Sequence, residues 1–247
     1  VNADLRSPPM GKITTITELQ NSLRTKLADK EPGEWVIGMG YDDTLLAEKR
    51  HPSRQDLDAI STKHPIYIIH TSGHMGVANS LALKTVNITI DTEAPVGGVI
   101  VKDPNTGELT GLLEETAQTP LLEHSMDFSA SELKTLLFSA VDEYAAAGMT
   151  TAQSGGMPLA MLKGISGAAK LGLIPFRLEL WPMLQQEDQE LYDALTNGTL
   201  NGADFESDMA QINRVKIVAD GSIQGFTGYL AQPYHSHFRG DEHYSGY

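Results

Sequence analysis

The fold class is decided by residues 149–183, which read MTTAQSGGMPLAMLKGISGAAKLGLIPFRLELWPM. This pattern predicts a short strand at 149–154, a helix at about 158–171 that ends at Gly172, and a second strand at 175–183. A polar helix at 187–196 and a third strand, RVKIVAD at 214–220, follow. Because strands that alternate with helices are typical of parallel βαβ units, we expect an α/β fold built from part of a barrel or of a doubly wound sheet.

Residues 1–128 contain shorter elements of mixed type. We expect helices at 15–30, 51–61 and about 77–84, and strands at 35–40 and 66–70. Two more strands lie within 97–113 and are separated by the turn sequence PNTG at 104–107. Ser129-x-x-Glu132 is a capping box and opens a helix that Gly148 ends, so the alternating part begins at residue 129.

Composition excludes several classes of function. The 247 residues contain 32 acidic and 18 basic side chains, for a net charge of −14, which argues against nucleic acid and anionic membranes as partners. The absence of cysteine excludes disulfides, thiolate nucleophiles and cysteine-bound metals, and it favours a reducing compartment such as the cytoplasm. Apolar runs such as 66–69 are too short to span a bilayer. The motifs GxGxxG, GxSxG, HExxH and the P-loop are all missing.

Polar side chains at strand ends are the candidate functional groups. In a strand over 214–220, Lys216 and Asp220 would share a face, either as a functional pair or as surface charge on an edge strand. His70 and His74 follow the apolar strand at 66–70, where they could contact a ligand or only shape a turn. Glu114 could act in acid–base chemistry or simply precede a helix.

Two further patterns favour a structural interpretation. His235-x-His237 has the spacing of a metal-binding pair, but no apolar strand leads into it, so a solvated loop is the simpler interpretation. Asp42-Asp43 is a carboxylate pair after the strand at 35–40, and we expect it to be solvated.

Five segments in a fixed order resemble one family. They are EWVIGMGYDDTLLAEKRHPSRQDLD (34–58), PIYIIHTSGHMGVANSLAL (65–83), DPNTGELTGLLEETA (103–117), AAAGMTTAQSGG (145–156) and VKIVADGSIQGFTGYLAQPY (215–234). Together they resemble the amidohydrolase-3 branch of the amidohydrolase superfamily. This branch includes N-substituted formamide deformylases and exoenzyme regulatory proteins.

The resemblance implies a metal-dependent hydrolase that acts on C–N bonds of amide or formamide type, other than peptide bonds, through a metal-activated water. Its fold is a (β/α)8 barrel. Residues 1–128 would be an insertion subdomain and 129–247 a partial barrel, with strands two to four at 149–154, 175–183 and 214–220. The cofactor would be one or two divalent metal ions, zinc foremost. Lys216 would be carboxylated as the metal ligand, His74 and Asp220 would be catalytic, and the substrate would contact His70, Glu114 and Trp181.

The family's first His-x-His pair and its later ligands have no counterpart in this sequence, which resembles an internal fragment of a longer enzyme. For the chain alone we therefore expect an unmodified Lys216, no dinuclear centre and no activity. The alternative is a non-catalytic ligand-binding or regulatory protein that keeps the fold. A third possibility is an unrelated barrel enzyme with a phosphate site. Such a site needs a glycine-rich start of a helix, and this sequence shows none. We expect a small-molecule substrate and a homo-oligomer, because a partial barrel leaves sheet edges exposed.

Overall fold

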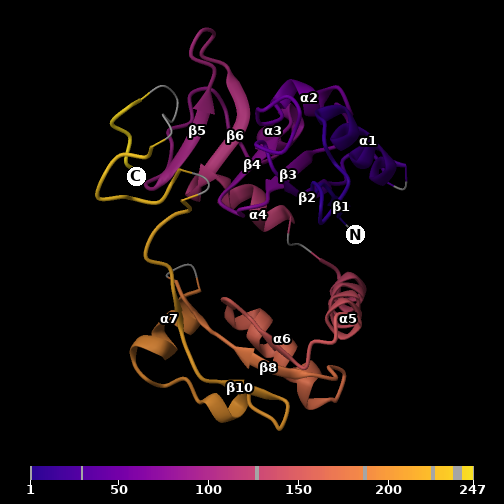
Figure 1. Cartoon of the computed structure of the whole chain (residues 1–247), viewed down its shortest axis with the longest axis vertical. Helices are drawn as coiled ribbons and strands as arrows, with labels where there is room; N and C mark the ends of the chain where they lie inside the picture. Colours follow the sequence, from indigo (N-terminus) through magenta and orange to yellow (C-terminus); the bar gives the residue numbers. More distant parts are fainter. Residues whose placement is uncertain are drawn as a thin grey trace. The chain divides into compact units, whose positions relative to one another are not determined.

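The chain forms two compact units in the computed structural model, which describes residues 2–28, 30–125, 128–185, 188–223, 226–235 and 241–246 (Figure 1). The first unit comprises residues 1–128 together with 220–247, and the second comprises residues 129–219. The sequence predicts a change of organisation at residue 129, and the structure changes there as well. Residues 220–247, expected with the barrel segment, pack with the first unit instead.

The first unit is built on a six-stranded sheet with the order β1-β2-β3-β4-β6-β5. Its strands are β1 (Ala3–Asp4), β2 (Val36–Tyr41), β3 (Ile66–His70), β4 (Met75–Ala78), β5 (Gly98–Lys102) and β6 (Leu109–Glu115). Strands β1, β2 and β3 are parallel, whereas β3, β4, β6 and β5 pair antiparallel. Residues 71–74 are therefore the turn of a β-hairpin, and the strand β4, which the sequence analysis did not predict, follows it.

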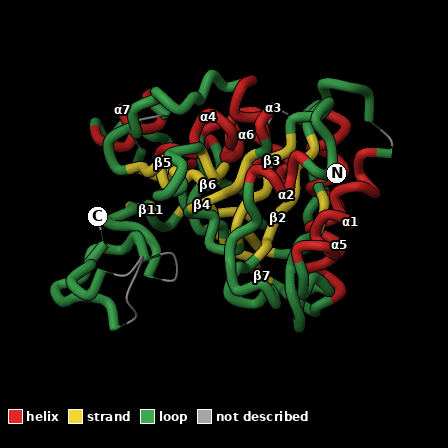
Figure 2. Tube along the Cα trace, turned by 90° about the horizontal axis from the view of Figure 1, so that it is seen from above, coloured by secondary structure: helices red, strands yellow, loops and turns green. Residues whose placement is uncertain are grey.

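Both faces of this sheet are covered, which explains why β3 is apolar from Ile66 to Ile69. Ile66 and Ile68 belong to one core cluster, and Tyr67 and Ile69 belong to another. A strand buried on both faces has no polar alternation, so IYIIH is the signature of a central strand. Figure 2 shows the strands of this sheet with helices beside them.

The helices of the first unit begin at side-chain caps. They are α1 (Ile16–Leu27), α2 (Arg54–Asp58), α3 (Ser80–Thr85) and α4 (Thr119–Ser125), and the 3-10 turn η1 (Thr116–Gln118) precedes α4. The hydroxyl of Thr15 accepts the backbone N–H of Glu18, and Ser53 forms a full capping box with Asp56. α1 packs its fully buried Leu19 and Leu23, which lie four residues apart on one face, into the core beside β2.

The second unit carries parallel strands joined by helices, as predicted. Its elements are α5 (Ala130–Ala146), β7 (Thr151–Gln153), α6 (Leu159–Lys170), β8 (Arg177–Leu180), β9 (Met183–Leu184), α7 (Gln189–Thr196), η2 (Gly202–Asp204), β10 (Ala210–Ile212) and β11 (Lys216–Ile217). β10, β8 and β7 form one parallel sheet, and β11 pairs in parallel with β9. The chain is thus mixed α/β. The capping box at Ser129 is present.

Two predicted strands of this unit are interrupted. The strand predicted at 175–183 ends at Leu180 and resumes at Met183, because Pro182 has no N–H for a ladder hydrogen bond. The strand predicted at 214–220 shrinks to Lys216–Ile217, and the missed strand β10 is the neighbour of β8 instead. The shared strand face proposed for Lys216 and Asp220 is therefore wrong, since the strand ends before Asp220.

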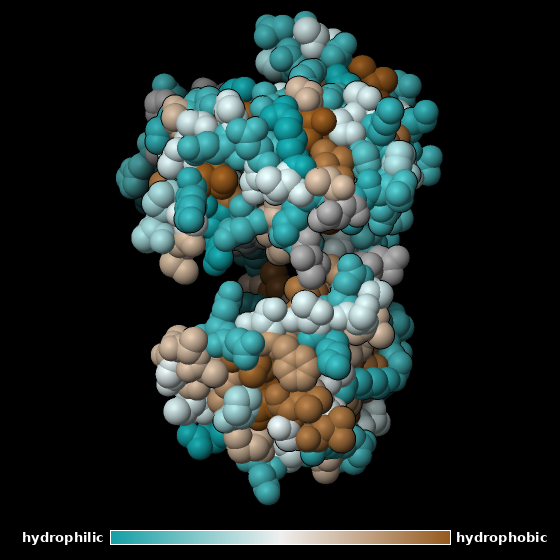
Figure 3. Space-filling model, turned by 90° about the vertical axis from the view of Figure 1, so that its right-hand side faces the viewer, coloured by the Kyte–Doolittle hydropathy of each residue, from teal (hydrophilic) through white to brown (hydrophobic). Residues whose placement is uncertain are grey.

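Large apolar side chains remain exposed on the second unit. They include Leu133, Tyr144, Met149 and Leu171. Figure 3 shows apolar residues gathered on one face of this unit. Such a surface is typical of one that further protein covers. Within the described ranges, no helix has both the length and the apolar character needed to cross a membrane.

Candidate functional site

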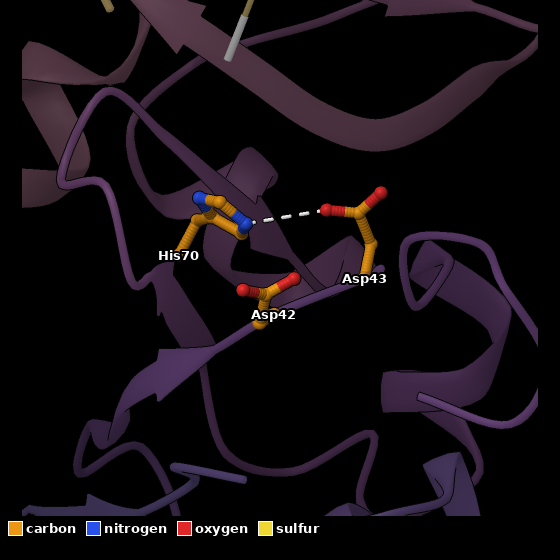
Figure 4. A group of neighbouring side chains, drawn as sticks. All are labelled: Asp42, Asp43 and His70. Atoms are coloured by element: carbon orange, nitrogen blue, oxygen red, sulfur yellow. Dashed lines mark ion pairs between the residues drawn. The ribbon is translucent and has the colours of Figure 1, made fainter. Parts of the chain in front are cut away.

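Two adjacent parallel strands bring Asp42, Asp43 and His70 together (Figure 4). In the β2–β3 ladder Tyr41 lies opposite His70, and the two aspartates follow Tyr41 directly. The carboxyl ends of parallel strands meet at one sheet edge, which commonly holds ligands. Nε2 of His70 lies 3.2 Å from Oδ1 of Asp43. The expectation that this carboxylate pair is only solvated charge is wrong for Asp43, which is half-buried between two histidines.

The second histidine is His51, whose Nε2 lies 3.7 Å from Oδ2 of Asp43. The hydroxyl of Tyr41 lies 3.1 Å from Nδ1 of His51 and positions that ring. Burial alone would raise the pKa of Asp43, but the contact with His70 and the nearby His51 outweigh it, so the pKa lies below its ordinary value. Asp43 is therefore an anion at neutral pH.

The hydrogen bonds of His70 fix its tautomer. Its Nδ1 accepts the backbone N–H of Ser72 at 3.1 Å, and the Ser72 hydroxyl lies 2.8 Å away. A nitrogen that accepts a backbone N–H carries no proton, so the proton of the neutral ring is on Nε2, facing Asp43. Nε2 is buried and makes no well-aligned hydrogen bond in spite of its closeness to Asp43.

This tautomer bears on metal binding. Asp42, Asp43 and His70 hold ligand atoms within 4.8 Å of one another, close enough for a cation. A histidine that binds a metal through one nitrogen donates the N–H of the other. His70 has the opposite arrangement, because its Nδ1 accepts and its Nε2 carries the proton. The three residues therefore do not fit a metal ion.

A cavity of about 750 Å³ in the first unit opens beside these groups. Its polar end is formed by Asp42, Asp43, Thr44, His70 and Thr71. Its other wall is mainly apolar and includes Ile223, Phe226, Leu230, Pro233 and Tyr234. His235 also lines it and is exposed, whereas its partner in the His-x-His pattern, His237, lies outside the described residues.

His74 forms a second pair, with Glu115. Its Nδ1 lies 3.0 Å from both carboxylate oxygens of Glu115, and the Glu115 N–H donates to the His74 carbonyl at 2.8 Å. A carboxylate only accepts, so Nδ1 carries the proton and Nε2 is left as an acceptor. His74 keeps a third of its side chain exposed. It does not line the cavity described above.

Glu115 has an unusual backbone conformation, with φ 49° and ψ −127°. These angles match the first central residue of a type II′ turn, which is usually glycine. Glycine at position 98 makes the turn possible, because a Cβ there would lie 2.4 Å from the Ala117 nitrogen. The strained turn directs the Glu115 carboxylate at His74, which is a feature often found at functional sites.

The other predicted site residues make different contacts. Glu114 is 2% exposed within β6 and lies outside the cavity lining. Asp220 is exposed and holds its own loop, accepting the N–H groups of Gly221 and Tyr229 at 2.7 Å each. Trp181, in the second unit, donates to Asn213 at 3.2 Å and stacks under Arg214.

Lys216 is half-buried on β11 of the second unit. Its stem passes Gly156, where an added Cβ would lie 3.3 Å from the lysine Cγ. Within the described part of the chain, its amine has no hydrogen bond or ion pair.

Sequence reasoning missed Glu115, the role of Asp43 and the wall at 223–235. A signal for Asp43 was present, since Asp42-Asp43 ends a strand just as His70 does. No local pattern marks the positive φ of Glu115. The wall packs against residues almost two hundred positions earlier in the chain, a contact that no local pattern could indicate.

Comparison with known proteins identifies the protein family of this chain. The chain belongs to the amidohydrolase family, whose sequence pattern matches residues 1–246. It is 30% identical over 182 residues to the N-substituted formamide deformylase of Arthrobacter pascens, a match that covers 72% of this chain and 33% of the relative. It is 31% identical over 207 residues to the YtcJ protein of Bacillus subtilis, covering 81% of this chain and 37% of YtcJ. The chain thus spans about a third of the length of these relatives.

The fold has solved counterparts. An uncharacterized metal-dependent hydrolase from Pyrococcus horikoshii aligns with 94% of this chain and 42% of its own length, with a TM-score of 0.57 and 21% identity. At this identity the likeness shows a shared fold.

Proposed function

We propose that the whole protein containing this chain is a metal-dependent hydrolase that cleaves C–N bonds of amide or formamide type, other than peptide bonds. Membership of the amidohydrolase family along residues 1–246 carries this proposal. The similarity to a deformylase that acts on N-substituted formamides supports the type of bond. In this proposal the second unit supplies barrel strands two to four and the first unit, through residue 128, is the insertion.

Lys216 is the metal ligand that this chain would contribute. Lys216 is half-buried, and its amine has no partner among the described residues. Addition of CO2 to this amine, with release of a proton to solvent, would give an anionic carbamate that could bind a metal ion. A bound divalent metal ion, zinc being our first choice, would supply a water acidic enough to ionise near neutral pH. The other ligands would come from the rest of the protein.

His74 is the residue we assign to the substrate. Glu115 holds the proton on Nδ1, so Nε2 can accept a hydrogen bond or a proton from a bound amide or water. His70 and Asp220 make structural contacts here, and their roles toward substrate, like those of Glu114 and Trp181, stay predictions. Association with a second copy of the chain is likewise a prediction.

A non-catalytic ligand-binding protein is the second candidate. One observation favours it: the only group of three His, Asp or Glu ligands found among the described residues, Asp42, Asp43 and His70, does not suit a metal ion. A protein of this kind would bind its ligand in the cavity beside Asp42, Asp43 and His70 and would not need Lys216 for its function.

The experiment that separates the two uses the longer protein, purified with and without added zinc. We expect bound metal and hydrolysis of an N-substituted formamide. Lys216→Ala should lose both, and short carboxylic acids should restore part of the activity by replacing the carbamate. Lys134→Ala, which removes an exposed lysine of α5, is the matched control and should change neither. Full activity and metal content in Lys216→Ala would reject the assignment.

A further inference from the structure

We propose that the cavity beside Asp42, Asp43 and His70 binds a protonated primary amine that carries a neighbouring oxygen and an apolar tail, the chemistry of an amino alcohol. This proposal concerns the first unit alone and does not depend on the hydrolase function. Three features of the cavity carry it: its charge, an unsatisfied donor and its apolar wall.

The charge of the polar end selects a cation. Asp43 is anionic at neutral pH, as its lowered pKa shows. Asp42 uses only Oδ1 inside the protein, accepting from the N–H and hydroxyl of Thr44 at 2.9 and 2.6 Å, and Oδ2 has no partner among the described residues. None of the described residues that line the cavity is lysine or arginine. The two carboxylates therefore favour a cationic ligand over a neutral or anionic one.

His70 supplies the second, independent feature. Its side chain is 5% exposed and lines the cavity, yet the proton on Nε2 lacks a well-aligned acceptor. Because its 3.2 Å contact with Oδ1 of Asp43 is poorly aligned, this buried donor is incompletely satisfied, and a ligand oxygen in line with the N–H would recover free energy. An ammonium group cannot accept this proton. The ligand therefore needs an oxygen next to its nitrogen, so that the oxygen faces His70 while the nitrogen faces the aspartates.

The apolar wall defines the rest of the ligand. Phe226 and Tyr234 lie with ring centroids 5.0 Å apart, and Ile223, Leu230 and Pro233 extend the surface. An alkyl or aromatic tail would remove this surface from water, and each buried methylene strengthens binding about fourfold. A metal ion would leave the wall unused, and the tautomer of His70 already opposes it.

The test compares matched small probes on the unmodified chain by calorimetry. We expect 1-aminohexan-2-ol to bind, and its neutral isostere hexane-1,2-diol to bind at least about tenfold more weakly, because only the amine pairs with the carboxylates. Hexylamine, which lacks the oxygen, should fall between the two. Shortening the tail to 1-aminobutan-2-ol should weaken binding about tenfold or more. Equal affinity for the amine and the diol, or no binding of either, would overturn the proposal.

Variants locate the site. Asp43→Asn should weaken 1-aminohexan-2-ol about tenfold, whereas Asp91→Asn, which removes an exposed carboxylate outside the cavity, should have no effect. The Nε2 resonance of His70 should shift on binding of the amino alcohol and much less with hexylamine. Binding of zinc or magnesium that displaces the amino alcohol and requires Asp43 would show a metal site and refute the proposal.

Discussion

Replacing Glu115 tests whether its backbone conformation is strained for the sake of His74. We compare the free energies of unfolding of Glu115→Gly and Glu115→Ala. Both variants remove the carboxylate that faces His74, so the loss of that contact does not affect the difference between them. At φ 49° and ψ −127° a non-glycine residue costs about 1–3 kcal/mol. Glycine loses about 0.5–1 kcal/mol more entropy on folding than alanine. The glycine variant should therefore be more stable than the alanine variant by about 1 kcal/mol.

Tryptophan fluorescence makes this measurement specific for the first unit. The chain has two tryptophans, Trp35 in the first unit and Trp181 in the second, so a Trp181→Phe background leaves Trp35 as the reporter. Urea unfolding of both variants in this background gives the difference in free energy of unfolding. An alanine variant as stable as the glycine variant, or more stable, would refute the strain argument.

Three further predictions concern stability. The pKa values of Asp43 and Asp56 are lowered in the folded chain, so both ionised carboxylates stabilise the folded state. This contribution to the free energy of unfolding is complete above the unfolded pKa of about 3.9 and is lost as pH falls through the folded pKa values. Acid titration followed by Trp35 fluorescence would measure this loss. Leu23→Ala should cost about 2–5 kcal/mol in urea unfolding of the first unit, because Leu23 is fully buried. Ser129→Ala removes the capping box of α5 and should cost about 1 kcal/mol, measured through Trp181.

Local chemistry explains which parts of the fold the sequence predicts well. The strand at 66–70 is matched residue for residue, because the unbroken apolar run at 66–69 favours a strand buried on both faces. The helix starts at Thr15 and Ser129 were signalled by side chains that cap neighbouring N–H groups, whereas the cap at Ser53 was missed and that helix was expected from residue 51. Such features depend on residues within four positions of one another.

Features that depend on distant contacts were missed. Met75–Ala78 is a strand because it pairs with β3 and β6, although MGVA alone has little strand character. The strand expected at 214–220 is shortened because its partner strand is broken at Pro182. The pairing of Glu115 with His74 joins residues 41 positions apart through a strained turn. The cavity is formed only because Ile223, Phe226 and residues 230–235 pack with the first unit.

The central claim, that this chain contributes a metal ligand to a C–N hydrolase, is tested most directly by the metal content of the longer protein with and without Lys216. We expect at least one equivalent of divalent metal in the unmodified protein and well under one equivalent in Lys216→Ala. Hydrolysis of an N-substituted formamide should be lost together with the metal. A Lys216→Ala protein that retains both its metal and its activity would contradict the assignment of Lys216 as a metal ligand.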